Sequence, residues 1–206
     1  ITGGLFLQKA THDFDYINYL LGERAKWIAA VKSKQIFKGD MPAGLRCEDC
    51  EKLETCPESI VHQRTGPYCA FAEDTGNEDS GSALIQYESG MHAVYSQNFF
   101  VRKTAGKRGA RLMGFKGTLE FDWYANEIVH HFHHANKPPD RYPVNVSLSQ
   151  GHGGGDAALL TNFLNVIRGE EASTTPLEDG LYSALMCLKA TVSAETRTFQ
   201  EISYAR

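Results

Sequence analysis

The sequence lacks any long hydrophobic run and any excess of positive charge. Its 206 residues contain no apolar stretch close to the roughly 18 residues that a membrane-spanning helix needs, so we expect no membrane span. The 21 Lys and Arg residues stand against 25 Asp and Glu residues, which gives a net charge of −4. A generally basic nucleic-acid binder is therefore excluded. The local basic cluster at residues 102–111 contains no aromatic residue, so we expect a solvated hairpin tip there and no nucleic-acid partner.

Internal repeats, low-complexity tracts and a secretory signal pattern are also missing from the sequence. Apolar residues make up 42% and charged residues 22%, which is ordinary for a globular protein. We expect one domain over residues 1–206, located in the cytoplasm. Because the first residue is Ile1 and not Met, we also expect the chain to be a piece of a longer protein.

The hydrophobic patterns predict strands and helices in separate parts of the chain. A helix with apolar residues three and four apart ends at Gly22, and two more are expected at residues 156–167 and 177–196. Alternating or β-rich segments predict strands at residues 25–37, 83–88, 91–101, 111–115, 118–123, 127–133 and 199–204, with a loop at 137–142. The predicted class is α+β, with one mostly antiparallel sheet and helices packed on one face.

His12 is the first candidate for chemistry. Histidine has the side-chain pKa closest to neutrality, so it suits proton transfer. The apolar run Leu5–Leu7 before it predicts that His12 lies where a strand ends and a helix begins, at the rim of a sheet. Lys9 is close enough in sequence to share such a site. The alternative is that His12 is simply a polar residue of the first helical turn.

A second candidate is the glycine-rich segment from Gly151 to Asp156. Its glycines permit close backbone approach before a helix, and Asp156 is a natural N-cap residue. His152 could face the same site as His12. The alternative is a flexible hinge followed by a capped helix. The segment is not a nucleotide-binding fingerprint, because no strand with GxGxxG spacing precedes it.

Four of the five cysteines lie in one short stretch, at positions 47, 50, 56 and 69. The long segment at residues 38–81, called here the Cys-rich insert, has little periodicity and needs something to hold it together. Four thiolates suit tetrahedral zinc, so Cys47, Cys50, Cys56 and Cys69 are candidate ligands of a structural zinc ion. Only the first pair has the short CxxC spacing of such sites, so cysteines that pack reduced or form disulfides remain the alternative.

Several short motifs occur in a fixed order along the chain. Gly3-Gly4 and His12-Asp13-Phe14-Asp15 come first, Gly151-His152-Gly153-Gly154-Gly155-Asp156 follows the strands, and Leu177-Glu178-Asp179-Gly180-Leu181 opens the last helix. Together they resemble the C-terminal domain of the glucose–fructose oxidoreductase/inositol dehydrogenase/MocA (Gfo/Idh/MocA) family over nearly the whole chain.

The resemblance implies a function and roles for particular residues. It implies the substrate-binding and oligomerisation half of an oxidoreductase that acts on a sugar, inositol or related polyol by hydride transfer. NAD or NADP would bind to an N-terminal Rossmann domain that this sequence does not contain, so we expect the chain alone to be inactive. His12 matches the catalytic histidine, and His152 and Asp156 match a segment that lines the substrate pocket. A homo-oligomer formed through the sheet face is implied as well.

One position departs from the family pattern. The family has an aspartate four residues before its catalytic histidine, and this chain has Gln8 there. Glutamine carries no charge and cannot raise the basicity of His12, but it can exchange hydrogen bonds with a substrate hydroxyl. We therefore expect Gln8 and Lys9 beside the substrate. Two alternatives stay open: a non-catalytic sugar-binding or sensor protein of the same fold, and an interaction module organised by a four-cysteine zinc site.

Overall fold

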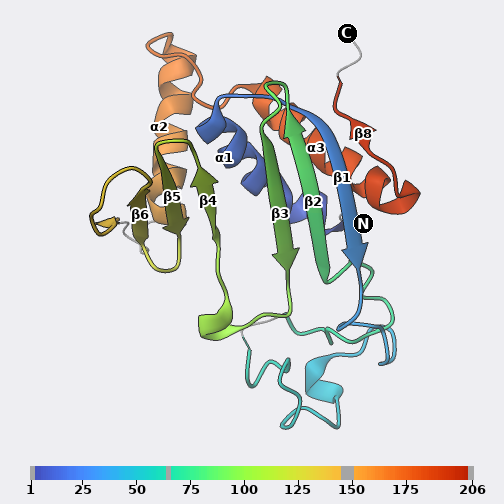
Figure 1. Cartoon of the computed structure of the whole chain (residues 1–206). Coiled ribbons are helices and arrows are strands. Elements are labelled where there is room, and N and C mark those ends of the chain that lie inside the picture. The colour runs from blue at the N-terminus through green and yellow to red at the C-terminus, as the bar shows by residue number, and fades with distance from the viewer. Residues whose placement is uncertain (1–2, 64–65, 145–150, 204–206) are drawn as a thin grey trace. The chain divides into compact units, whose positions relative to one another are not determined.

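The computed structural model describes residues 3–63, 66–144 and 151–203 (Figure 1). The chain divides into two compact units, one formed by residues 1–100 and 175–206 and the other by residues 101–174. The strands form two four-stranded antiparallel sheets, one in each unit, where the sequence predicted one sheet. The predicted α+β class and the antiparallel pairing are confirmed. None of the helices in the described residues is both long and apolar enough to cross a membrane.

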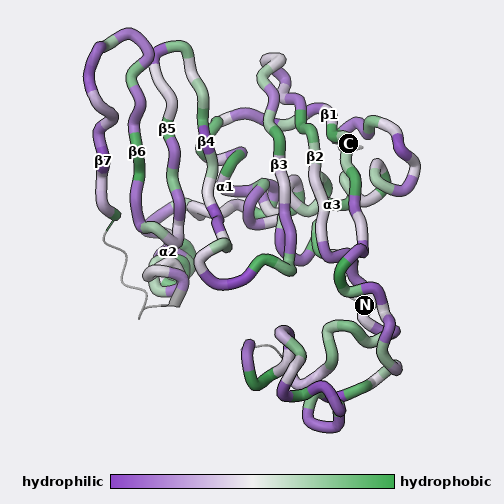
Figure 2. Tube along the Cα trace, turned by 60° about the horizontal axis from the view of Figure 1, so that its bottom comes forward, coloured by the Kyte–Doolittle hydropathy of each residue, from purple (hydrophilic) through white to green (hydrophobic). Residues whose placement is uncertain are grey.

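The sheet of the first unit has the strand order β3-β2-β1-β8. Its strands are β1 (Ala25–Ser33), β2 (Ser80–Tyr87), β3 (His92–Asn98) and the short β8 (Gln200–Glu201). In β2, buried and more exposed side chains alternate from Gly81 onward, as expected when one face of a strand is packed and the other is open. Figure 2 shows hydrophobic segments within β1, β2 and β3.

Helices cover one face of this sheet (Figure 1). They are a π-helical segment η1 (Phe6–Ala10), which runs directly into α1 (Thr11–Leu21), and the long α3 (Leu177–Thr196). Gly22 ends α1 in the left-handed conformation, with φ of 64°, as its place in the sequence predicted. The core lies between helices and sheet, and its fully buried side chains include Phe6, Ile28, Ile85, Tyr87, Met186 and Cys187.

The Cys-rich insert leaves the end of β1 and returns at the start of β2 (Figure 1). A 3-10 turn η2 (Cys47–Asp49), an antiparallel bridge between Arg46 and Tyr68 and a parallel bridge between Met41 and Ala72 give it local order. The ring of Phe37 packs edge-on against Phe71, with centroids 5.4 Å apart. Backbone pairing and a small apolar contact thus hold the segment in the structure.

The second unit contains a meander of β4 (Gly109–Met113), β5 (Gly117–Asp122), β6 (Glu127–Phe132) and β7 (Asp140–Pro143). It also contains two 3-10 segments, η3 (Lys103–Ala105) and η4 (Gly151–Gly154), and the helix α2 (Gly155–Arg168). The predicted loop at residues 137–142 is wrong in its second half, because β7 pairs with β6 there. An edge strand can tolerate nearby prolines since it needs a partner on one side only.

Candidate functional site

The segment that carries Gln8, Lys9 and His12 is helical throughout. Helical structure begins at Gly4, passes through η1 and continues as α1, so the predicted strand at Leu5–Leu7 is wrong. His12 is the second residue of α1 and does not lie at a strand end. Apolar residues at Leu5–Leu7 were insufficient evidence for a strand, because a run that short is equally compatible with a buried helical turn.

The three candidate residues share the exposed side of this helix. Phe6, Ala10 and Phe14 face the core and are at most 2% exposed. Gln8, Lys9 and His12 are exposed. Residues four apart lie on one helix face, so Gln8 and His12 are neighbours along the surface. The wider π-helical turn just before α1 is itself notable, because π-helical turns occur frequently at functional sites.

The residues next to His12 tie the helix to its surroundings. The Tyr95 hydroxyl on β3 donates a hydrogen bond to Asp13 Oδ2 over 2.9 Å, and the Tyr95 ring packs edge-on against Phe14. Ser183 of α3 donates to Asp15 Oδ1 over 3.1 Å. Burial and the charge of Asp13 raise the pKa of Tyr95 far above its usual range, so this hydroxyl remains a donor. Sequence analysis missed Tyr95, and no local pattern in the sequence marks it.

His152 and Asp156 contact each other in the second unit. His152 Nδ1 and Asp156 Oδ1 are 2.8 Å apart, and the two side chains are 86% and 63% exposed. Asp156 does not cap α2 as predicted: Gly154 occupies the N-cap position, and Asp156 bonds to the imidazole instead. His12 belongs to the other unit, so the prediction that His152 and His12 face one site stays a prediction.

All five cysteines are free thiols. Cys47 and Cys69 lie next to the bridge between Arg46 and Tyr68, and both are buried. Burial raises the pKa of the Cys69 thiol, and a hydrogen bond with the Phe71 backbone acts in the opposite direction without cancelling it. Within the described residues, however, no group of three His, Cys, Asp or Glu side chains is arranged to hold a metal ion.

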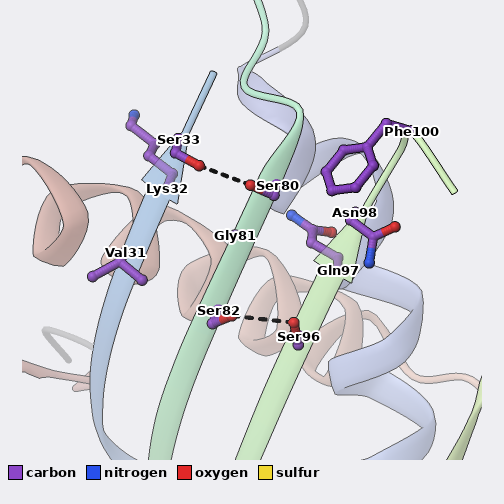
Figure 3. A pocket seen from close by; sticks show the side chains of 10 residues that line it. All are labelled: Val31, Lys32, Ser33, Ser80, Gly81, Ser82, Ser96, Gln97, Asn98 and Phe100. Carbon is purple, nitrogen blue, oxygen red and sulfur yellow. Dashed lines mark hydrogen bonds between the residues drawn. The ribbon is translucent and has the colours of Figure 1, made fainter. Parts of the chain in front are cut away.

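A shallow depression of about 360 Å³ lies along β1, β2 and β3 (Figure 3). Its walls are mostly short polar side chains, and these largely bond to one another: Ser33 to Ser80 over 2.8 Å and Ser82 to Ser96 over 3.1 Å. None of the predicted substrate-binding residues lines it. It is therefore a different place from the exposed face of η1 and α1.

Comparison with known proteins identifies the family. Residues 1–202 match the Gfo/Idh/MocA family described as the oxidoreductase family, C-terminal alpha/beta domain. The chain belongs to this family, and the predicted resemblance is confirmed.

Individual relatives agree with this assignment. YteT of Bacillus subtilis (strain 168), named as a candidate oxidoreductase, is 27% identical over 211 residues, which cover 79% of this chain and 46% of YteT. A levoglucosan dehydrogenase in complex with NADH and levoglucosan has the same fold, with a TM-score of 0.67 and 16% identity over 95% of this chain and 49% of that protein. A candidate myo-inositol dehydrogenase from Sinorhizobium meliloti 1021 gives a TM-score of 0.55 and 18% identity over 98% of this chain and 51% of that protein. The chain thus spans about half the length of these relatives.

Proposed function

We propose that this chain is the substrate-binding half of an NAD- or NADP-dependent oxidoreductase that oxidises a sugar, inositol or related polyol. The observation that carries the proposal is the exposed face of η1 and α1, where Gln8, Lys9 and His12 lie together. Hydrogen bonds from Tyr95 and Ser183 to Asp13 and Asp15 hold this helix in place. The family assignment and the levoglucosan and myo-inositol dehydrogenases among the similar structures support the choice of substrate class.

We assign no residue among those the structure describes to the nicotinamide cofactor. The sequence contains no strand–GxGxxG–helix unit, and the relatives are about twice as long. The nicotinamide would accept the hydride from the substrate carbon, and its site would belong to the part of the protein outside this sequence. The residues of this chain are therefore assigned to the substrate and to the proton.

His12 would act as the general base. A secondary alcohol that loses hydride from its carbon must also lose the hydroxyl proton, and a neutral imidazole can accept that proton. Lys9 would donate a hydrogen bond to the same oxygen, and Gln8 would bind a neighbouring hydroxyl through its amide. His152 and Asp156 are proposed as further substrate-binding residues. Because Gln8 is uncharged, it would not take the part of the carboxylate that the family has four residues before its histidine.

The test uses the complete protein, with levoglucosan, glucose and myo-inositol offered together with NAD or NADP. We expect reduction of one of the cofactors, and loss of at least a hundredfold in kcat for His12→Ala. His92→Ala is the matched control, because His92 is an exposed histidine on β3. A complete protein that binds one of these compounds but never reduces the cofactor would favour the non-catalytic sugar-binding alternative.

The variant Gln8→Asp further distinguishes an oxidoreductase from a non-catalytic sugar-binding protein. If this position limits proton transfer, a carboxylate there should raise kcat and shift its pH profile, because a negative charge favours the protonated imidazole. An unchanged kcat would show that Gln8 does not limit the reaction. If the wild type is inactive and Gln8→Asp creates turnover, the native protein is a binding protein on an oxidoreductase fold.

A homo-oligomer through the open sheet face is part of the same proposal. Val31, Leu84 and Val94 are 67%, 41% and 79% exposed, and Leu84 and Val94 are register partners on adjacent strands. Such an apolar face, left uncovered by helices, is typical of an interface. Light scattering of the complete protein tests it, and a monomer at micromolar concentration would contradict it.

We also propose that Cys47, Cys50, Cys56 and Cys69 bind one structural zinc ion. The free thiols, the η2 turn in which Cys50 N–H donates to the Cys47 carbonyl over 3.2 Å, and the bridge that joins the flanks of Cys47 and Cys69 support this. Since the side chains do not converge in the described structure, the metal would have to draw them together.

Metal analysis decides the zinc proposal. We expect about one zinc per chain, lost in Cys69→Ser and retained in Cys187→Ser, because Cys187 is buried in the core far along the chain from the insert. Less than about 0.2 zinc per chain in protein prepared without chelator would contradict a closed four-thiolate site.

A further inference from the structure

The last part of the Cys-rich insert, residues 73–81, is called here the return segment. It contacts the start of the helix that carries His12. The first amides of a helix have no partner inside it and need an acceptor from elsewhere. Here the acceptor is one carboxylate oxygen: Leu5 N–H donates to Glu78 Oε1 over 2.7 Å, and Phe6 N–H donates to the same atom over 3.3 Å. A negative charge at this end is also favoured by the helix dipole.

Gly4 makes this close approach possible. It has a φ of 85°, which side chains other than glycine rarely adopt. A Cβ at this position would lie 3.2 Å from both carboxylate oxygens of Glu78. The contact with Glu78 therefore explains why glycine is required at the second position of the Gly3-Gly4 motif in this chain.

Glu78 is itself held by its neighbour in sequence. Asp79 is 1% exposed, and its Oδ2 accepts hydrogen bonds from the backbone N–H groups of Ile36 and Phe37. The Asp79 amide donates to the Ser33 carbonyl, and the Asp79 carbonyl accepts from Phe99 N–H. The backbone next to Glu78 is thus fixed to the ends of β1 and β3, so Glu78 presents its carboxylate from a rigid base.

Phe6 provides a second contact between the same two segments. Its side chain is fully buried and lies against Gly81, where a Cβ would come within 2.9 Å of the Phe6 ring. The start of the helix is therefore located by two interactions with residues 78–81: hydrogen bonds to the Glu78 carboxylate and packing of Phe6 on the bare backbone of Gly81.

We infer that Glu78 is a positioning residue for the exposed face of η1 and α1. It fixes where the helix starts and thereby where Gln8, Lys9 and His12 stand, one to two turns further along. It also connects the Cys-rich insert to the candidate site, so that a change in the fold of the insert would reach His12 through Glu78. The inference rests on the proposed function only for the role of His12, because the contact itself is independent of any substrate.

The experiment compares Glu78→Ala and Glu78→Gln in the complete protein, with Glu73→Ala as the control. Glu73 is an exposed acid of the same return segment, and its side chain makes no hydrogen bond or ion pair with the described residues. Hydrogen exchange is followed at the amides of residues 5–12, and kcat and KM are measured for the compound that the proposed function identifies.

We expect the Leu5 and Phe6 amides of Glu78→Ala to exchange at least tenfold faster than those of the wild type. We expect kcat to fall about tenfold while KM for the nicotinamide cofactor stays unchanged, because His12 is displaced and the cofactor site is not. Glu78→Gln should restore most of both, since its amide oxygen still accepts hydrogen bonds. Glu73→Ala should match the wild type.

Unchanged exchange at Leu5 and Phe6 would overturn the inference, and so would accelerated exchange with normal kcat. A fall in kcat that Glu78→Gln does not rescue would equally remove the hydrogen-bond explanation. If the complete protein oxidises none of the compounds, the proposed function fails by itself. The exchange measurement would then still decide whether Glu78 positions this helix.

Discussion

The two groups of candidate site residues are held in very different ways. The helix of Gln8, Lys9 and His12 is bonded to residues far away in sequence: Tyr95 is 82 residues from Asp13, and Ser183 is 168 residues from Asp15. The hydrogen bond of His152, by contrast, is to Asp156, four residues away. The first group is fixed by the whole first unit and suits a proton-transfer residue that needs accurate placement. The second is held by a local contact only, which would suit a pair that adapts to a ligand.

The largest loss of stability is expected at Asp79, which is buried and fixes the backbone next to Glu78. Asp79→Ala removes the buried carboxylate that accepts hydrogen bonds from the backbone N–H groups of Ile36 and Phe37. We expect the free energy of unfolding to fall by about 3 kcal/mol in urea titrations. A loss below about 0.5 kcal/mol would mean that the Asp79 carboxylate does not hold the two ends of the insert together.

The stability of the fold should also depend on pH through the Asp79 carboxylate. Burial acts to raise the pKa of Asp79, but hydrogen bonds from the Ile36 and Phe37 backbone outweigh it and leave the pKa below its ordinary value. A lowered pKa stabilises the fold above the unfolded-state pKa of about 4, and this stability is lost as the pH falls through the folded-state pKa. Asp79→Asn should therefore show a smaller loss of stability on acidification than the wild type does.

A slightly smaller effect is expected at Gly81, under Phe6. An added methyl group in Gly81→Ala would lie within 2.9 Å of the Phe6 ring, so the helix start must shift. We expect a loss of about 2 kcal/mol in unfolding free energy, together with faster exchange of the Phe6 amide. The control is Gly180→Ala in α3, where a Cβ meets nothing within 4 Å. This control should stabilise the protein, since alanine is the better helix former.

Tyr95→Phe should have a moderate effect, because it removes the hydroxyl that bonds to Asp13 and Gln97 and keeps the ring contact with Phe14. We expect a loss of about 1.5 kcal/mol by urea unfolding, as for other hydrogen bonds to a charged group. Tyr19→Phe tests the same chemical change on α1 at a position that is 83% exposed, and it should be silent. Equal losses in both variants would show that the Tyr95 hydrogen bond does not anchor the helix.

The local features of this fold are predictable from the sequence, and the long-range contacts are not. β-rich segments bounded by turn residues predicted β5 and β6 almost to the residue, because that signal lies in consecutive positions. The π-helical turn escaped, since Leu5–Leu7 alone does not distinguish a strand from a helix. His12 and Gln8 were found through an ordered set of motifs. Tyr95 and Glu78, which bond to Asp13 and to the Leu5 amide of the same helical segment, lie more than 70 residues from these partners, and only the fold brings them together.

The smallest effect on stability is expected at Asp156, and this makes it the sharpest test of the comparison. Its contact with His152 is an exposed pair, and such pairs contribute little to folding. Asp156→Asn should change Tm by less than about 2 °C. If the pair binds the substrate, KM for the sugar or polyol should still rise about fivefold in the complete protein, through one weakened hydrogen bond. A fall in Tm as large as that of Tyr95→Phe would show that the second group is anchored as firmly as the first. The distinction between a fixed proton-transfer helix and an adaptable binding pair would then fail.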